Sequence, residues 1–477
     1  MRRIDAIGRL ADFGRALLVS RRELAQSDRS DDKELALLQR RRLDDLIRLA
    51  VRRSPFYRDH YRGVDLDRLH LAALPPVTKT QLMARFDDWV TDDRLKLADL
   101  ERHLERLTRD ELYLGRYRVM ATSGSTGRRG VFVYDRVAWR RNLANFARLN
   151  ECYVGVHPRV PRRLRVTAVG ATSPVHISAR TSLSAGVGIN RVLRLDARQP
   201  LEELVASLDA FQPEFLVGFP SVLSLLAHEQ HEGRLHLRPA KVATVSEVRT
   251  PEMTDAIRSA WGVRPFNWYG ITEGGVVAGD CQHHQGMHLF EDLFLVENVD
   301  GDGMPVADGV VGQKLLLTNL FNRTQPLVRY ELSDMVVLDS RPCPCGRASR
   351  RVTSIEGRME DVLHFPKRDG GEVAVQPFML ESPFTHLADV RQYKVVHEND
   401  GLRVLLVVRD GARIQATSQR VRDALAAILA EVNAVPPPIL VDVVPRLARE
   451  QGHGAKFKLI ESRRRASGAP SKETRCP

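Results

Sequence analysis

The chain has no long apolar run and few cysteines, and both absences restrict what it can be. No stretch of its 477 residues approaches the roughly 20 consecutive apolar residues needed to span a bilayer. Charged side chains interrupt the residues after Met1, which argues against a secretory signal. The five cysteines are odd in number and lack the spacing of a secreted disulfide framework, so we expect a reducing cytoplasm.

Motifs typical of nucleic-acid binding are also missing, although the formal net charge is +12. Arginine and lysine are scattered among aspartate and glutamate, and no zinc-finger, helix-turn-helix or RNA-recognition pattern accompanies them. The basic surface therefore indicates attraction of anionic small molecules such as ATP, and no nucleic acid is expected as a partner.

The length of 477 residues predicts more than one domain. Residues 1–110 read mostly as helices, and beyond them short strands alternate with helices, which is typical of a layered α/β sheet. A β-rich region follows over residues 288–340. We therefore expect an α/β fold with a large N-terminal domain over 1–358, a small α+β domain over 359–461, and a disordered basic tail over 462–477.

Two local patterns make sharper predictions. Thr78 has the position of an N-cap for a helix over residues 79–89. The turn sequence Asn-Asp-Gly before residue 402 predicts a hairpin of two strands, 390–397 and 402–408.

The segment 122–130 contains only Gly, Ser, Thr and Arg. Small residues let the backbone approach an anion closely, and amide, hydroxyl and guanidinium groups can then donate to phosphate. Strand-like runs flank the segment on both sides, and it lacks the Gly-Lys-Ser/Thr ending of a P-loop. A flexible surface turn is the alternative that the segment alone leaves open. The candidate phosphate-binding residues are Thr122, Ser123, Gly124, Ser125, Thr126, Gly127 and Arg128.

Further segments follow this loop in a set order, namely 267–273, 328–334, 355–362 and 454–458. Their order and spacing resemble the adenylate-forming ligases, which activate a carboxylate with ATP. The resemblance is narrower to the phenylacetate–CoA ligase branch, including its relatives that adenylate a deazaflavin coenzyme. It covers nearly the whole chain, and branch-specific support comes from segments 54–57, 74–79, 286–288 and 343–347.

The resemblance implies how ATP and Mg²⁺ are held. Glu273 would bind Mg²⁺, since a hard cation prefers carboxylate oxygen, and Thr272 would contact phosphate. Tyr269, followed by Gly270, would stack on the adenine, with core packing as the alternative. Asp334 would accept hydrogen bonds from the ribose hydroxyls, because an ionised carboxylate acts only as an acceptor.

Basic residues are further candidates by the same resemblance. Lys456 would be the catalytic lysine of the small domain, where an ammonium can approach the carboxylate and the α-phosphate together, and Lys458 could take that role instead. Arg329 and Arg358 could hold phosphate or orient the hinge between the domains, or could equally form surface ion pairs.

The phosphate loop departs from the family pattern. Its common ending is Pro and Lys, whereas Arg129 and Gly130 stand at these places. Arg128 or Arg129 could supply the missing charge. The phosphate role therefore survives, but the usual lysine contact is absent.

The cysteines suggest a metal site. Cys343 and Cys345 form a tight pair, and Cys281 precedes several histidines. Three thiolates and one imidazole would make a closed tetrahedral Zn²⁺ site, which is typical of a structural metal. His288 is favoured as the fourth ligand because it belongs to the Gly-Met-His element of the resembling branch, and free buried thiols remain the alternative.

These features predict ATP-dependent adenylation of a carboxylic acid, aryl or of medium apolar size. Release of pyrophosphate and transfer to a thiol, most simply coenzyme A, would follow. A nucleotidyl transferase that leaves AMP on an acceptor hydroxyl is one alternative, and a non-catalytic ATP-binding scaffold is another. The expected partners are the small-molecule acid and the thiol acceptor, and a homodimer is left open.

Overall fold

The computed structural model describes most of the chain. The described residues are 12–66, 70–122, 129–157, 163–185, 189–358, 362–375, 379–380, 384, 387, 389–409, 411–445, 447 and 459–463. They divide into two compact units, one ending at Ile355 and one beginning at Glu356, whereas the sequence placed this boundary at residue 358. None of the described helices is long and apolar enough to cross a membrane.

The N-terminal part of the first unit is helical, as expected. Thr78 Oγ1 accepts from the Gln81 amide at 3.2 Å and Gln81 Oε1 accepts from the Thr78 amide at 2.9 Å, which is a capping box. The single helix expected over 79–89 is instead two helices, because Arg85 leaves the helical conformation between them. The elements of this part are η1 (Ser20–Leu24), α2 (Ala25–Ser27), α3 (Asp32–Arg53), α4 (Pro55–His60), η2 (Leu71–Ala73), α5 (Lys79–Ala84), α6 (Phe86–Trp89) and α7 (Leu97–Glu105).

A nine-stranded sheet forms the centre of the first unit, in the order β13-β14-β9-β8-β7-β6-β5-β3-β4. The strands from β4 to β7 are parallel, and the pairs β7–β8, β8–β9 and β9–β14 are antiparallel. Its strands are β3 (Arg165–Gly170), β4 (Arg191–Asp196), β5 (Phe215–Gly218), β6 (Lys241–Val245), β7 (Phe266–Ile271), β8 (Gly275–Asp280), β9 (Met287–Leu289), β13 (Asp334–Asp339) and β14 (Arg351–Arg358).

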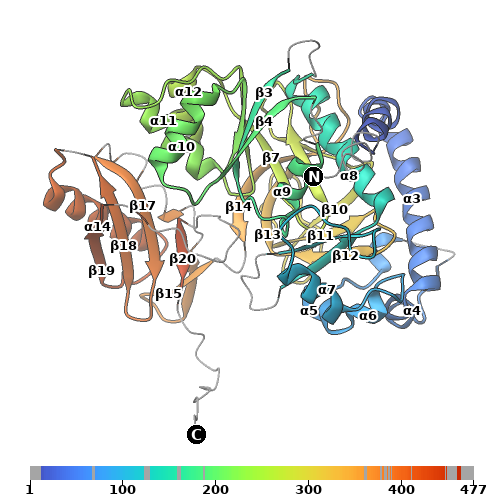
Figure 1. The fold of residues 1–477 in the computed structure, drawn as a ribbon. Helices are drawn as coiled ribbons and strands as arrows, with labels where there is room; N and C mark the ends of the chain where they lie inside the picture. The colour runs from blue at the N-terminus through green and yellow to red at the C-terminus, as the bar shows by residue number, and fades with distance from the viewer. Residues whose placement is uncertain are drawn as a thin grey trace, which may run out of the picture. The chain divides into compact units, whose positions relative to one another are not determined.

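Helices connect the parallel strands, because parallel neighbours need a crossover. These helices are α9 (Ile177–Ala185), α10 (Leu201–Phe211), α11 (Pro220–His231) and α12 (Pro251–Trp261), and α8 (Arg136–Arg148) with η3 (Leu149–Val154) precedes β3. Figure 1 shows α10, α11 and α12 side by side along the parallel strands, where Leu204, Leu223 and Ile257 are buried in one apolar layer.

The opposite face of the same strands contributes to a second and larger apolar core. Val166, Val217 and Val245 pack against it, together with buried residues of α8. Both faces of the parallel strands are therefore covered, and in open α/β sheets of this kind ligands bind at the carboxyl ends of the strands.

Two smaller sheets complete the first unit. β1 (Arg118–Ala121) and β2 (Val131–Tyr134) form a buried antiparallel pair on either side of the expected phosphate loop. β10 (Phe294–Val299), β11 (Lys314–Asn319) and β12 (Leu327–Leu332) form an antiparallel three-stranded sheet. The expected α/β class with a β-rich region is therefore confirmed.

The second unit has its own apolar core and the expected α+β composition. β17 (Val390–His397) and β18 (Leu402–Val408) form the predicted hairpin, and a side chain at Gly401 would clash with the carbonyl oxygen of Pro438. The remaining elements are β15 (Leu363–Pro366), β16 (Glu372–Val375), α14 (Ile414–Glu431), β19 (Ile439–Val443) and β20 (Ile460–Ser462).

Candidate functional site

The base of the expected phosphate loop is a closed hairpin. The Thr122 amide donates to the Gly130 carbonyl at 2.9 Å, and the Gly130 amide donates to Thr122 Oγ1 at 2.9 Å. A side chain at Gly130 would lie 2.9 Å from the Phe132 ring, so glycine avoids a clash with the ring two residues further along the returning strand. Thr122 thus orients the two ends of the loop, and the other candidates lie outside the described residues, namely Ser123, Gly124, Ser125, Thr126, Gly127 and Arg128.

The turn between β7 and β8 carries Thr272 and Glu273. Glu273 is 6% exposed, and Tyr330 donates its hydroxyl to Glu273 Oε1 at 3.3 Å. Tyr134, at the end of β2, donates its hydroxyl to the Thr272 carbonyl at 2.8 Å. Burial, reinforced by the charge of Glu273, raises the pKa of Tyr134 well above its usual value, so this hydroxyl keeps its proton. The turn is therefore tied to the strand that follows the phosphate loop.

Tyr269 and Gly270 lie on β7 just before this turn. Tyr269 is 6% exposed and belongs to the larger core, which favours the core-packing alternative, and adenine stacking stays a prediction. Gly270 lies against Val245 of the neighbouring strand, and a side chain there would be 3.6 Å from Val245 Cγ2. At that distance a side chain would make ordinary van der Waals contact, so the packing of β6 and β7 does not by itself require glycine.

Asp334 opens β13, directly after β12, and is buried. Tyr330 precedes it on β12 and contacts Glu273, so the candidate ribose and Mg²⁺ ligands belong to adjoining segments. The ribose role of Asp334 remains a prediction.

Arg329 has a different environment from the one expected. Its Nε and Nη2 donate to the two carboxylate oxygens of Glu297, each at 3.0 Å, and Nη1 donates to the carbonyls of Ala72 and Leu74. The residue is buried and has a φ of 49°, in the left-handed region that non-glycine residues rarely adopt. The expectation that Arg329 holds phosphate is corrected, because its donors are used within the protein. The ion-pair alternative is observed, although the pair is buried.

The roles of the remaining basic candidates stay predictions. Arg358 ends β14 and belongs to the second unit, so its role stays a prediction. Lys456 and Lys458 lie outside the described residues.

Ser246 and Glu247, directly after β6, are two further candidate site residues that the sequence patterns did not single out. Ser246 has a φ of 74°, and such strained positions cluster at ligand sites. Glu247 Oε2 accepts from the Ser221 amide at 3.2 Å, at the start of α11. Both residues follow a parallel strand at its carboxyl end, where ligands bind in open α/β sheets. A Ser-Glu pair directly after a buried strand was the signal in the sequence.

The four candidate zinc ligands come together from separate segments. The ligand atoms of Cys281, His288, Cys343 and Cys345 all lie within 4.8 Å of one another. Cys281 Sγ is 3.7 Å from Cys343 Sγ, and Cys345 Sγ is 3.3 Å from His288 Nε2. A tetrahedral Zn²⁺ with Zn–S bonds near 2.3 Å holds two sulfurs about 3.8 Å apart, so donor types and spacing fit zinc. His284 instead has Nδ1 3.5 Å from Asp280 Oδ2.

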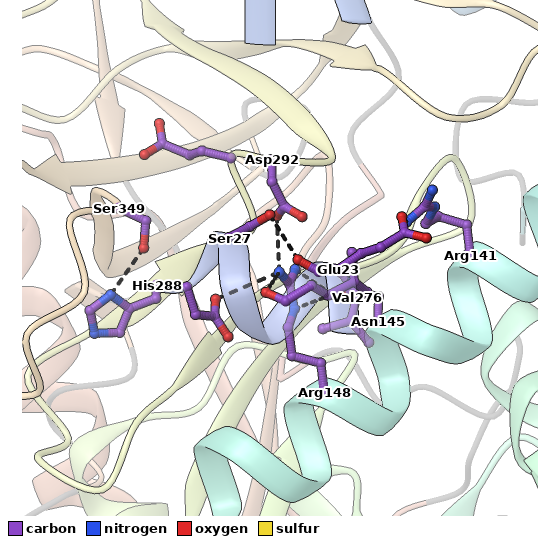
Figure 2. A network of polar contacts seen from close by, with 12 residues as sticks. Glu23, Ser27, Arg141, Asn145, Arg148, Val276, His288, Asp292 and Ser349 are labelled. Carbon is purple, nitrogen blue, oxygen red and sulfur yellow. Dashed lines mark hydrogen bonds and ion pairs between the residues drawn. The ribbon is translucent and has the colours of Figure 1, made fainter. Parts of the chain in front are cut away.

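The orientation and protonation of His288 also suit a metal ligand. Its Nδ1 lies 3.2 Å from Ser349 Oγ, as Figure 2 shows, which leaves Nε2 for the cluster. Burial, reinforced by Arg347, lowers the pKa of His288 to about 4, so the imidazole is neutral at neutral pH. Burial raises the pKa of Cys281 to about 12, so a thiolate there needs a cation, which a bound metal would supply.

A buried polar network lies close to this cluster. Arg148 is fully buried, and it donates to Asp292 Oδ1 at 3.0 Å, to Asn145 Oδ1 at 2.7 Å and to the Leu24 carbonyl at 3.2 Å (Figure 2). Although burial lowers it, the pKa of Arg148 is raised overall by Asp292 and Asp28. The arginine therefore stays charged and attaches the N-terminal helical segment to α8 and to the connection between β9 and β10.

Comparison with known proteins agrees with the fold and the motifs. No family model matches the chain. Phenylacetate-coenzyme A ligase from Thermus thermophilus is 28% identical over 392 residues, which cover 77% of this chain and 79% of that protein. Protein CapK from Staphylococcus aureus is 23% identical over 401 residues, 80% of each protein.

Solved structures extend the likeness to the fold. A 2-hydroxyisobutyryl-CoA ligase in the postadenylation state, in complex with 2-HIB-AMP, has a TM-score of 0.71. The match covers 91% of each chain at 20% sequence identity. The chain thus shares the fold of a CoA ligase solved with an acyl-adenylate and is similar in sequence to phenylacetate-coenzyme A ligase, in agreement with the resemblance that its motifs indicated.

Proposed function

We propose that the protein is an ATP-dependent acid–thiol ligase that adenylates a carboxylic acid, releases pyrophosphate and passes the acyl group to coenzyme A. The supporting observation is that Tyr134, on the strand after the phosphate loop, bonds to the turn bearing Glu273. This contact joins β2 to the turn that bears Glu273, the proposed Mg²⁺ ligand. The homologous phenylacetate-coenzyme A ligase and the structurally similar 2-hydroxyisobutyryl-CoA ligase are both named as CoA ligases.

Each residue has a defined task in this proposal. Glu273 offers a carboxylate that is oriented by Tyr330, and Thr272 donates its hydroxyl to phosphate. Asp334 accepts from the ribose, and Lys456 neutralises charge between the acid and the α-phosphate. Bound Mg²⁺ neutralises the triphosphate. The acid is aryl or of medium apolar size in this proposal.

The cluster of Cys281, His288, Cys343 and Cys345 would hold one structural Zn²⁺. All four positions of a tetrahedral ion are then filled by the protein, so the metal supplies stability and no chemistry. Free thiols at this spacing persist in a reducing compartment, and we place the protein in the cytoplasm for that reason.

A panel of aryl and medium-sized aliphatic acids tests the proposal. Pyrophosphate release is measured with ATP and each acid, with and without coenzyme A, and the products are identified by mass spectrometry. The expected result is acid-dependent release and a thioester that forms only when coenzyme A is present. AMP on an acceptor hydroxyl would instead identify a nucleotidyl transferase. ATP binding without pyrophosphate–ATP exchange for any acid would instead indicate a non-catalytic ATP-binding scaffold.

A further inference from the structure

Three amide side chains, one at the end of β11 and two in the connection to β12, are almost completely buried. Asn319, Asn322 and Gln325 are at most 2% exposed, although each carries polar atoms that are costly to remove from water. Buried amides are therefore expected to have hydrogen-bond partners, and their partners show what the segment does.

The acceptor oxygens of the two asparagines shape the segment itself. Asn319 Oδ1 accepts from the amides of Phe321 and Asn322, each at 3.1 Å. Asn322 Oδ1 accepts from the amides of Thr324 and Gln325 at 3.3 and 3.4 Å. These local bonds fix the backbone and direct the side-chain NH₂ groups toward other elements.

The donor groups reach two different parts of the candidate site. Asn319 Nδ2 donates to the carbonyl of Glu273 at 3.0 Å. Asn322 Nδ2 donates to the carbonyl of Val133 at 2.9 Å, on the strand that follows the phosphate loop. Gln325 uses both amide atoms on the same strand, because Nε2 donates to the Val131 carbonyl at 3.0 Å and Oε1 accepts from the Val133 amide at 2.7 Å.

Gln325 and Asn322 therefore bond to the backbone of β2 much as a neighbouring strand would. The Glu273 turn receives further support from other elements. Tyr134 donates to the Thr272 carbonyl, and Asn145 Nδ2 donates to the Val276 carbonyl at 2.7 Å (Figure 2). The turn and the start of β8 are thus held by side chains of β2, α8 and the end of β11.

We propose that Asn319, Asn322 and Gln325 form an amide clamp that sets the spacing between β2, the strand after the phosphate loop, and the turn that bears Glu273. They are positioning residues, because they act on the ATP and Mg²⁺ ligands through backbone atoms. The inference rests on the proposed adenylation and deepens it. The clamp assigns Asn319 to the Mg²⁺ side of the site, and it assigns Asn322 and Gln325 to the phosphate side.

The test compares two buried Asn→Asp substitutions in the same three-stranded sheet. Asn319→Asp keeps the acceptor that shapes the segment but loses the donor to Glu273. Asn298→Asp is the matched control, since Asn298 is also buried and donates to the carbonyls of Val310 and Val336 at 3.3 and 3.2 Å. Its register partner is Leu315, at the opposite end of β11 from Asn319.

The measured quantity is the Mg²⁺ concentration that produces half of the maximal response at a fixed ATP concentration. It is read from pyrophosphate–ATP exchange and, independently of activity, from the Mg²⁺-dependent shift in melting temperature. Asn319→Asp should raise it about tenfold, the order expected when a buried acceptor loses its donor, and excess Mg²⁺ should restore the exchange rate. Asn298→Asp should lower the melting temperature without this change.

A second variant, Asn322→Asp, keeps the test decisive if Asn319→Asp does not fold. It should raise KM for ATP about tenfold while the Mg²⁺ requirement at saturating ATP stays near that of the parent. An Asn319→Asp or Asn322→Asp protein that matches Asn298→Asp in both quantities would refute the clamp. A parent protein without any Mg²⁺-dependent ATP effect would instead refute the proposed function.

Discussion

Zinc should stabilise the first unit, and Cys343→Ser should abolish that effect. Cys343 is buried, with its Sγ 3.7 Å from Cys281 Sγ, whereas Cys152 is an exposed free cysteine outside the cluster. Cys152→Ser is therefore the matched control. The serine at 343 removes one thiolate from a closed shell, and zinc prefers sulfur to a neutral hydroxyl.

The size of the effect follows from the binding equilibrium. Free zinc at 100 times its Kd stabilises the folded state by about 2.7 kcal/mol. Residues 1–355 form the unit concerned, and its unfolding entropy is about 0.75 kcal/mol/K at roughly 2.1 cal/mol/K per residue. Dividing the two values predicts a loss of about 4 °C in melting temperature when the metal is removed.

Metal analysis and thermal unfolding measure this directly. Protein purified without chelator should contain about one zinc per chain, as expected for one closed four-ligand site. A chelator should lower the melting temperature of the parent and of Cys152→Ser, but not that of Cys343→Ser, which should already be lowered. Metal-free parent protein with the same melting temperature would refute the site and leave these residues as buried thiols.

Three more predictions concern catalysis and pH. Glu273→Gln should slow adenylation at least about tenfold, since a charge contact to the triphosphate is lost, and an unchanged Mg²⁺ dependence would contradict its role. Lys456→Ala should abolish adenylation but spare transfer from a pre-made acyl-adenylate, and equal loss of both half-reactions in folded protein would exclude this role. Burial raises the pKa of Asp28 despite Arg148, so the stability it contributes is present below the unfolded pKa of about 3.9 and is lost as pH rises through the native value. In urea unfolding, the free energy of unfolding of Asp28→Asn should therefore increase relative to that of the parent as pH rises from about 4. The opposite trend would contradict the assignment.

Local sequence patterns predicted most of the secondary structure because the signals are short-range. Thr78, as a capping residue, located the start of α5 (Lys79–Ala84), and an Asn-Asp-Gly turn located the β17–β18 hairpin. The prediction of one helix over residues 79–89 was wrong at Arg85, where the backbone leaves the helical conformation. Its guanidinium bonds to Asp59 as well as to the nearby Asp88, and the expected helix divides there.

The sequence also determined which residue types could bind metal, phosphate and ribose, and it named His288 in advance of the structure. Only the tertiary structure decided their partners. It placed Arg329 against Glu297 instead of phosphate, and it brought Asn319 to the carbonyl of Glu273. The bond from Gln325 to Val131 spans 194 residues of sequence separation. No local pattern encodes such a contact, because the geometry of a buried hydrogen bond exists only after the intervening chain has packed.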